Sequence, residues 1–209
     1  MMFRGKGPRT RRLLAYLQRR ERTSPARRGV LDCSTYPSLF HRHAVVYTDT
    51  ADFTLRTARD GILHFLMVFN RLVVQAEPML RRHAGRLIKV EADSLLMRFP
   101  DVDAACHGVD AMESLLRRLN RGRVANEQLR FSYGIGFGDM LDLEEDLFGL
   151  EVNLASKLGE DLAKPGEALL TPTAAAAPSQ ALLRRVVPYR IVTFGNVSLP
   201  VQQLKLPRR

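Results

Sequence analysis

Two aspartates lie at points where short apolar segments would end as strands. Asp49 directly follows VVYT, residues 45–48, and Asp93 lies in a tight break between two segments with strand character. Two carboxylates at converging strand ends would suit a hard cation such as Mg²⁺ or Mn²⁺. Aspartates also end strands as turn formers or caps, so this pattern alone leaves both interpretations open.

The elements that would position these aspartates follow from the hydrophobic periodicity. Apolar residues at helical spacing predict a helix over Asp60–His83, ended by Gly85. It lies between strands predicted at His43–Thr48, 86–91 and 94–99. In a βαββ unit the first and third strands are neighbours, so Asp49 and Asp93 can converge.

The remaining pattern predicts a second αβ unit with additions. Its segments are a helix at 102–119, a strand at 129–137, a helix at 147–162, a strand at 167–171, a helical turn at 174–177 and closing strands at 190–194 and 201–206. The order βαββαβ predicts an α+β fold, an open and mostly antiparallel sheet covered by helices.

The composition excludes several classes of protein. Hydrophobic residues make up 45% and charged residues 26% of the 209 residues, as in globular proteins. No apolar run reaches the roughly 18 residues of a membrane span, and the basic start has no apolar core of a secretory signal. Cys33 and Cys106 belong to no metal or disulfide motif, so we expect a reducing, cytoplasmic location.

The positive charge is concentrated at the N-terminus. Residues 1–40 carry ten Lys or Arg against Glu21 and Asp32, a net +8 of the chain's +10. We interpret 1–40 as a basic extension, a short amphipathic helix at 10–22 plus a linker at 23–40, and 41–209 as the main domain. The extension could contact an anionic membrane surface, nucleic acid or an acidic partner, or only solubilise the chain. The nearly balanced main domain argues against nucleic acid as a partner.

Three segments resemble the class III nucleotidyl cyclase catalytic domain, in the family's order. VVYTDTADFT (45–54) resembles F-x-D-I-x-G-F-T, and HAGRLIKVEADSLLMRFPDVDAA (83–105) resembles H-G-G-x-x-x-K-x-x-G-D-x-x-x-x-x-F. DLFGLEVNLASKLGEDLAKPGEALLT (146–171) resembles D-x-x-G-x-x-V-N-x-A-x-R-L…A-x-P-G-E-I-L-x-T. The resemblance covers about residues 43–206. It implies a ferredoxin-like βαββαβ core with additional C-terminal strands and helices.

The resemblance implies a two-metal phosphoryl transfer that converts ATP to 3′,5′-cyclic AMP and pyrophosphate. Asp49 and Asp93, with the backbone carbonyl of Thr50, would hold two Mg²⁺ or Mn²⁺ ions. Phe53 and Thr54 lie in the turn that would wrap the metals and the triphosphate.

The resemblance also implies roles for four polar residues. By this resemblance, Lys89 and Asp146 occupy the purine-selecting positions. This pair suits adenine, whereas guanylyl cyclases carry Glu and Cys at these positions. Asn153 would orient the ribose. Lys157 stands at the place of the arginine that stabilises charge on the α-phosphate in the transition state.

Several residues depart from the family pattern. Asp52 and Ala92 replace glycines, and Lys157 replaces arginine and so loses the bidentate fork. Phe194 stands where the family has a phosphate-binding lysine. These departures favour an alternative, a degenerate cyclase homology domain that binds nucleotide or dimerises without catalysis.

Class III sites form between two domains, so the resemblance implies a head-to-tail homodimer. In the family, a hairpin arm helps to hold the second subunit. The corresponding segment here, residues 136–146, is shorter, so we expect a weaker contact between subunits. We therefore hypothesise that Leu13, Leu14 and Leu17 pack between subunits.

Overall fold

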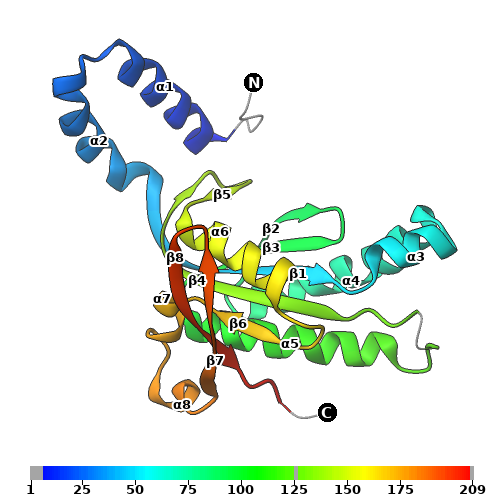
Figure 1. Cartoon of the computed structure of the whole chain (residues 1–209). Helices are drawn as coiled ribbons and strands as arrows, with labels where there is room; N and C mark the ends of the chain where they lie inside the picture. The colour runs from blue at the N-terminus through cyan, green and yellow to red at the C-terminus, as the bar shows by residue number, and fades with distance from the viewer. Residues whose placement is uncertain (1–6, 125–126, 208–209) are drawn as a thin grey trace.

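One eight-stranded sheet forms the centre of the main domain (Figure 1). The computed structural model describes residues 7–124 and 127–207. The strand order is β2-β3-β1-β4-β6-β8-β7, with β5 beside β4, and β4 and β6 are parallel while the other pairs are antiparallel. The strands are β1 Phe40–Thr50, β2 Arg86–Glu91, β3 Ser94–Phe99, β4 Phe131–Asp142, β5 Leu147–Phe148, β6 Ala168–Leu170, β7 Val186–Phe194 and β8 Val197–Leu204.

Helices cover both faces of this sheet. The main core lies between the sheet and helices α4 and α5, whereas α6 packs against β1 and β4 with Val45, Met140 and Ala155 buried between them. The helices are α1 Pro8–Arg22, α2 Pro25–Leu39, α3 Phe53–Asp60, α4 Ile62–Arg82, α5 Val102–Asn120, α6 Leu150–Lys157, the π-helical η2 Leu158–Leu162, α7 Pro172–Ala175 and α8 Gln180–Leu183. No helix in the described part of the chain is long and apolar enough to span a bilayer.

The predicted α+β class and ferredoxin-like core are confirmed. Strands β4, β1, β3 and β2 lie side by side in that order, which is the arrangement of a βαββαβ unit. Val46 pairs with Met97 of β3 and with Ile135 of β4, so β1 is central. Both strands predicted at 86–91 and 94–99 have the predicted bounds.

Glycines in β4 let α6 approach the sheet closely. A Cβ added at Gly134 would lie 1.9 Å from the backbone oxygen of Ala155, and one at Gly136 would lie 2.5 Å from that of Glu151. Any larger residue at these positions would push α6 away from the strand. The close approach fixes the height of α6, and therefore of Asn153 and Lys157, over the sheet.

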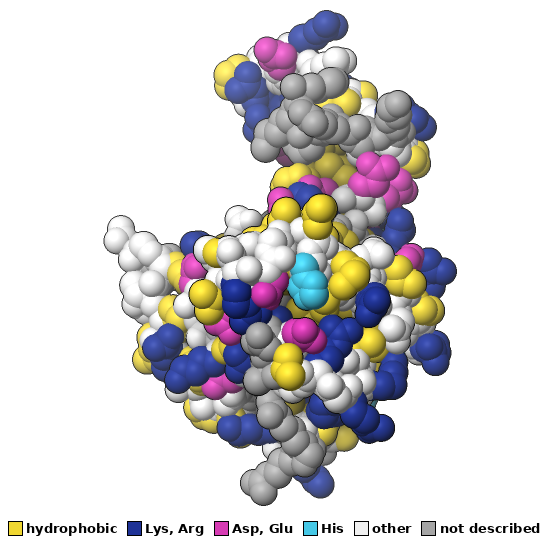
Figure 2. Space-filling view, turned by 90° about the vertical axis from the view of Figure 1, so that its right-hand side faces the viewer, with side chains coloured by type: hydrophobic (Ala, Val, Ile, Leu, Met, Phe, Trp, Pro, Cys, Tyr) yellow, Lys and Arg dark blue, Asp and Glu magenta, His cyan; other side chains and the backbone are white. Residues whose placement is uncertain are grey.

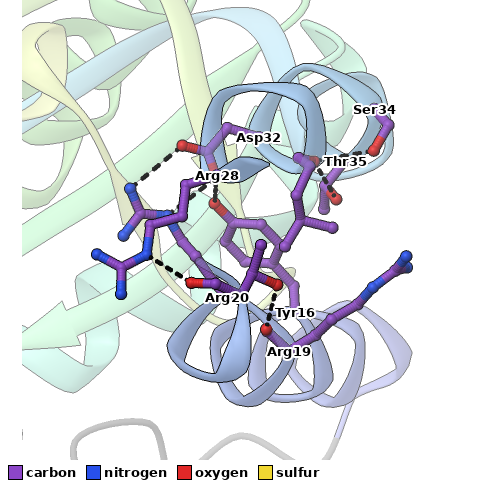
Figure 3. A network of polar contacts seen from close by, with 9 residues as sticks. Tyr16, Arg19, Arg20, Arg28, Asp32, Ser34 and Thr35 are labelled. Atoms are coloured by element: carbon purple, nitrogen blue, oxygen red, sulfur yellow. Dashed lines mark hydrogen bonds and ion pairs between the residues drawn. The ribbon is translucent and has the colours of Figure 1, made fainter. Parts of the chain in front are cut away.

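The predicted linker at 23–40 is wrong, because residues 25–39 form helix α2. Pro25 occupies the first turn, where its missing N–H costs nothing, and Pro37 lies in the last turn. Helix α2 folds back on α1 as a hairpin, in which Asp32 accepts hydrogen bonds from Tyr16 (2.6 Å) and Arg20 (2.9 Å) (Figure 3). These tertiary contacts outweigh the weak helix propensity of the α2 sequence. Residues 1–6 of the predicted extension lie outside the described residues.

The helix predicted over Asp60–His83 is present as α4, Ile62–Arg82. Gly61, whose φ is 82°, separates it from the short helix α3, which was not predicted. The left-handed residue that ends this region is Ala84 rather than Gly85. The segment predicted as a helix over 147–162 begins with the short strand β5 and ends as π-helical η2. Cys33 is exposed, Cys106 is buried, and both are free.

The α1–α2 hairpin stands out from the main domain in two perpendicular views (Figures 1 and 2). Its base packs on the domain, where Leu13 and Leu39 are buried against Leu143. Because Leu13 is 5% exposed within its own chain, it is not free to pack between subunits as hypothesised. Leu17 remains 39% exposed.

Candidate active site

Asp49 and Asp93 are brought together by the pairing of β1 with β3. Asp49 lies one residue before the end of β1, and Asp93 lies in the turn between β2 and β3. The Thr50 hydroxyl donates to the backbone carbonyl of Asp93 (2.6 Å), and the Leu95 N–H donates to the Thr48 hydroxyl (3.0 Å). The turn needs a left-handed residue, and Ala92 supplies it at a φ of 51°. The predicted convergence is therefore present.

This pair of carboxylates lies in an acidic and partly desolvated environment. Burial and the charges of Asp93, Glu160 and Asp161 raise the pKa of Asp49 from 3.8 to about 6. Asp93 is 9% exposed, and burial together with Glu160 raises its pKa. Hydrogen bonds from the Thr50 backbone oppose both shifts without cancelling them. A bound cation would relieve this repulsion.

Glu160 and Asp161 are neighbours of the site that the sequence analysis did not assign. They lie on η2, which packs against β1 and β4, and Glu160 accepts a hydrogen bond from Ser156 (2.9 Å). Burial and a hydrogen bond with Glu160 raise the pKa of Tyr47 to about 12. In the sequence, the two acids at three and four residues after Lys157 were the available signal. Among the described residues, no three His, Cys, Asp or Glu side chains are arranged to hold a metal ion.

Lys89 and Asp146 are also brought together, 57 residues apart in sequence. The Lys89 ammonium lies 3.4 Å from Asp146 Oδ2 and 3.3 Å from Glu91. Burial disfavours the ammonium, but the charges of Asp146 and Glu91 outweigh it and raise the pKa of Lys89. The two side chains are 37% and 32% exposed, so a ligand could reach both.

Asn153 and Lys157 lie one turn apart on the exposed side of α6. The Lys157 ammonium is 3.7 Å from Asp161 and 5.9 Å above the ring of Phe194. Phe194, which replaces the family's lysine, therefore contacts the residue that replaces the family's arginine. The structure places Lys157 against these two groups rather than against Asp49 or Asp93.

The turn after β1 is held by contacts that leave its backbone strained. Asp52 has a φ of 63°, and its exposed carboxylate pairs with Arg130 (3.0 Å). Phe53 packs edge-on against Phe65 at the margin of the main core, with ring centroids 4.8 Å apart. Thr54 is exposed at the start of α3. The extra carboxylate of Asp52 is thus partly neutralised by Arg130.

Comparison with known proteins finds likeness to nucleotide cyclases, in sequence over part of the chain and in fold over most of it. No family model matches the chain. One curated relative, named putative adenylate cyclase 3 of Rhizobium meliloti, is 27% identical over 123 residues, which are 59% of this chain. The chain spans about a fifth of that relative's length, because the match covers 21% of it.

Solved structures of cyclases share the fold. The catalytic core of a rhodopsin-guanylyl cyclase with converted specificity, in complex with ATPαS, aligns with a TM-score of 0.68 at 16% identity, covering 80% of this chain and 97% of that one. An adenylate/guanylate cyclase/hydrolase from Silicibacter pomeroyi gives 0.64 at 21% identity, covering 81% and 98%. The adenylyl cyclase CyaB from P. aeruginosa gives 0.62 at 18% identity, covering 81% and 97%.

Proposed function

Because this chain has the fold of class III adenylyl and guanylyl cyclase catalytic domains, we propose that it is an adenylyl cyclase that converts ATP to 3′,5′-cyclic AMP and pyrophosphate. The observation that carries the choice of ATP is the contact between Lys89 and Asp146. The neighbouring structures include both adenylyl and guanylyl cyclases, so the fold alone leaves the base open.

The chemistry of the Lys89–Asp146 pair matches adenine. The Lys89 ammonium can donate to adenine N1, and the Asp146 carboxylate can accept from the 6-amino group. Guanine presents a donor at N1 and an acceptor at O6. It would therefore place a donor opposite the Lys89 ammonium and an acceptor opposite the Asp146 carboxylate, and neither hydrogen bond could form. Asp146 Oδ1 already accepts the Leu147 N–H (2.9 Å), which leaves Oδ2 for Lys89 or a base.

Asp49 and Asp93 fit divalent cations, because two partly buried carboxylates with raised pKa values lack a compensating charge at this point. They would hold Mg²⁺ or Mn²⁺, with the Thr50 carbonyl as a further oxygen ligand. When bound, such ions would lower the pKa of the ribose 3′-hydroxyl and stabilise charge on the phosphates. The protein's own part is to hold these carboxylates at a fixed separation through the Thr50 and Thr48 hydrogen bonds.

We place the complete site between two copies of the chain. Asn153 and Lys157 are exposed on α6, and Lys157 contacts Asp161 and Phe194. A nucleotide bound to Lys89 and Asp146 of one copy would meet Asp49 and Asp93 of the other in a head-to-tail homodimer. Asn153 would then contact the ribose, and Lys157 the α-phosphate after leaving Asp161.

A second candidate is a cyclase homology domain without catalysis. Three features favour it. Lys157 lacks the bidentate fork of an arginine, its ammonium contacts Asp161, and the Asp52 carboxylate lies in the turn that would wrap the triphosphate. In either case we place the protein in the cytoplasm, and the exposed arginines of α1 could bind an acidic protein or an anionic membrane surface.

The decisive experiment measures cyclic nucleotide formation by the purified chain from ATP or GTP, with Mn²⁺ or Mg²⁺. Asp49→Ala is the variant expected to be inactive. Asp139→Ala is its matched control, because it removes an aspartate at an exposed position of β4. Cyclic AMP from ATP that is lost only in Asp49→Ala supports the cyclase. Metal-dependent ATP binding without product would support the second candidate, and neither binding nor product would contradict both.

A further inference from the structure

The turn that presents Asp146 is organised by another aspartate, Asp142. Asp142 Oδ1 accepts the N–H of Glu144 (2.9 Å), and the N–H of Leu143 donates to the carbonyl of Asp146 (3.0 Å). Glu144 has a φ of 71°, a conformation that a residue with a side chain adopts only when its surroundings enforce it. The position of Asp146 opposite Lys89 therefore depends on the Asp142 carboxylate.

Cationic side chains from three separate elements hold Asp142 in place. Its side chain is fully buried, and Oδ2 is paired with Arg98 of β3, with His43 of β1 (3.4 Å) and with Arg9 of α1 (2.6 Å). Arg98 and His43 belong to the sheet itself. Arg9 comes from the N-terminal hairpin, so one of the positive charges that neutralise Asp142 lies outside the main domain.

The hairpin makes a second contact on the same turn. Leu13 packs with Leu39 against Leu143, and Arg9 Nε lies 3.8 Å from Glu144. One turn of α1 thus contacts three consecutive residues at the start of this turn, Asp142, Leu143 and Glu144. A merely solubilising arm would not need a buried apolar contact and an ion pair at this one point.

We propose that Arg9 and Asp142 are positioning residues for purine recognition: α1 holds the β4–β5 turn in the conformation that sets Asp146 against Lys89. The inference rests on the proposed function and adds to it a contact from outside the cyclase fold. Any partner that moves α1 would then alter the base-binding pair without touching the nucleotide.

The kinetic test compares Arg9→Ala, Arg9→Lys and Arg22→Ala in the full chain. Arg22 is exposed at the far end of α1, so its variant removes the same charge without touching Asp142. We expect Arg9→Ala to raise the KM for ATP and lower the ATP-over-GTP ratio of kcat/KM about tenfold, with kcat nearly unchanged. Arg9→Lys should restore most of the ratio. An unchanged ratio in Arg9→Ala would overturn the proposal.

Hydrogen exchange of the same variants gives a readout that needs no activity. We expect the amides of Leu143, Glu144 and Leu147 to exchange faster in Arg9→Ala than in wild type or Arg22→Ala, while Leu31 in α2 stays protected. Unchanged exchange in the turn would contradict the coupling. If wild type makes no cyclic nucleotide but the turn loosens in Arg9→Ala, the coupling stands and the proposed reaction is what fails.

Discussion

Asp142 on one side, and the pair Asp49 and Asp93 on the other, are at least partly buried, and their pKa values move in opposite directions. Asp142 has no exposed side-chain surface, yet hydrogen bonds and charges from His43, Arg98 and Arg9 overcome its burial and hold its pKa well below the usual range. Asp49 and Asp93 are less buried, and burial raises both of their pKa values, helped by the charge of Glu160 at both residues and of Asp161 at Asp49. Burial disfavours charge at both places, and the sign of the neighbours decides the outcome.

The difference separates a structural role from a binding role. At Asp142 the protein supplies positively charged partners, so the carboxylate is neutralised and the β4–β5 turn is held in place. At Asp49 and Asp93 the protein supplies more negative charge, so the folded state carries an unfavourable energy that a cation would relieve. Of four predictions, ordered from the largest expected effect to the smallest, three test this contrast and one tests the proposed base-binding pair.

Asp49→Asn should abolish most of the activity. The substitution keeps the shape but removes a charged ligand, and losing about 4 kcal/mol of transition-state stabilisation lowers kcat about a thousandfold. The measurement is cyclic AMP formation at saturating Mn²⁺, with Asp139→Asn as the control. Activity within tenfold of wild type would mean that Asp49 holds no essential cation.

Asp142→Asn should lower the free energy of unfolding by about 3–5 kcal/mol, because it removes the buried carboxylate that the partly buried Arg98 and Arg9 both pair with. Urea denaturation followed by circular dichroism would measure the loss, with Asp139→Asn expected to change it by less than about 0.5 kcal/mol. If Asp142→Asn is as stable as wild type, the contrast between the two sites does not hold.

The double substitution Lys89→Glu with Asp146→Cys should shift the preference from ATP toward GTP. Reversing the donor and acceptor at the base should change the ratio of kcat/KM by about 10–100-fold. Each single substitution is the control, since it reverses only one contact. An unchanged ratio would show that this pair does not touch the base.

Asp49→Asn should also stabilise the metal-free protein at high pH. The pKa of Asp49 is raised from 3.8 to about 6 on folding, so the folded state binds more protons between these values and loses stability as pH rises through them. Removing the carboxylate should therefore add about 1–2 kcal/mol to the free energy of unfolding at pH 8 and nothing near pH 3.5. Denaturation in EDTA at both pH values would show it, and equal stability of the variant and wild type at pH 8 would contradict the raised pKa.

Local patterns predicted the parts of the fold that depend on neighbours in sequence. The alternating segments at 86–91 and 94–99 became β2 and β3 with the predicted bounds, and the βαββαβ order gave the ferredoxin-like core. Helix predictions failed where tertiary contacts intervened. The segment predicted as a helix over 147–162 begins as strand β5, and α2 forms despite its prolines because it packs on α1.

The candidate site shows the same division. Asp49 and Asp93 could be named from residue types and spacing, Lys89 and Asp146 from the resemblance to the cyclases, and the structure brings each pair together. Glu160, Asp161 and Arg9 could not be assigned, because their relation to the site depends on how η2 and α1 pack on the sheet. The sequence by itself determined which residues became candidates for binding a cation or a base, since these candidates follow from residue chemistry and from the resemblance to the cyclases. Only the tertiary structure decided which carboxylate is neutralised and which is left charged, because that depends on the side chains that distant elements place within a few ångströms.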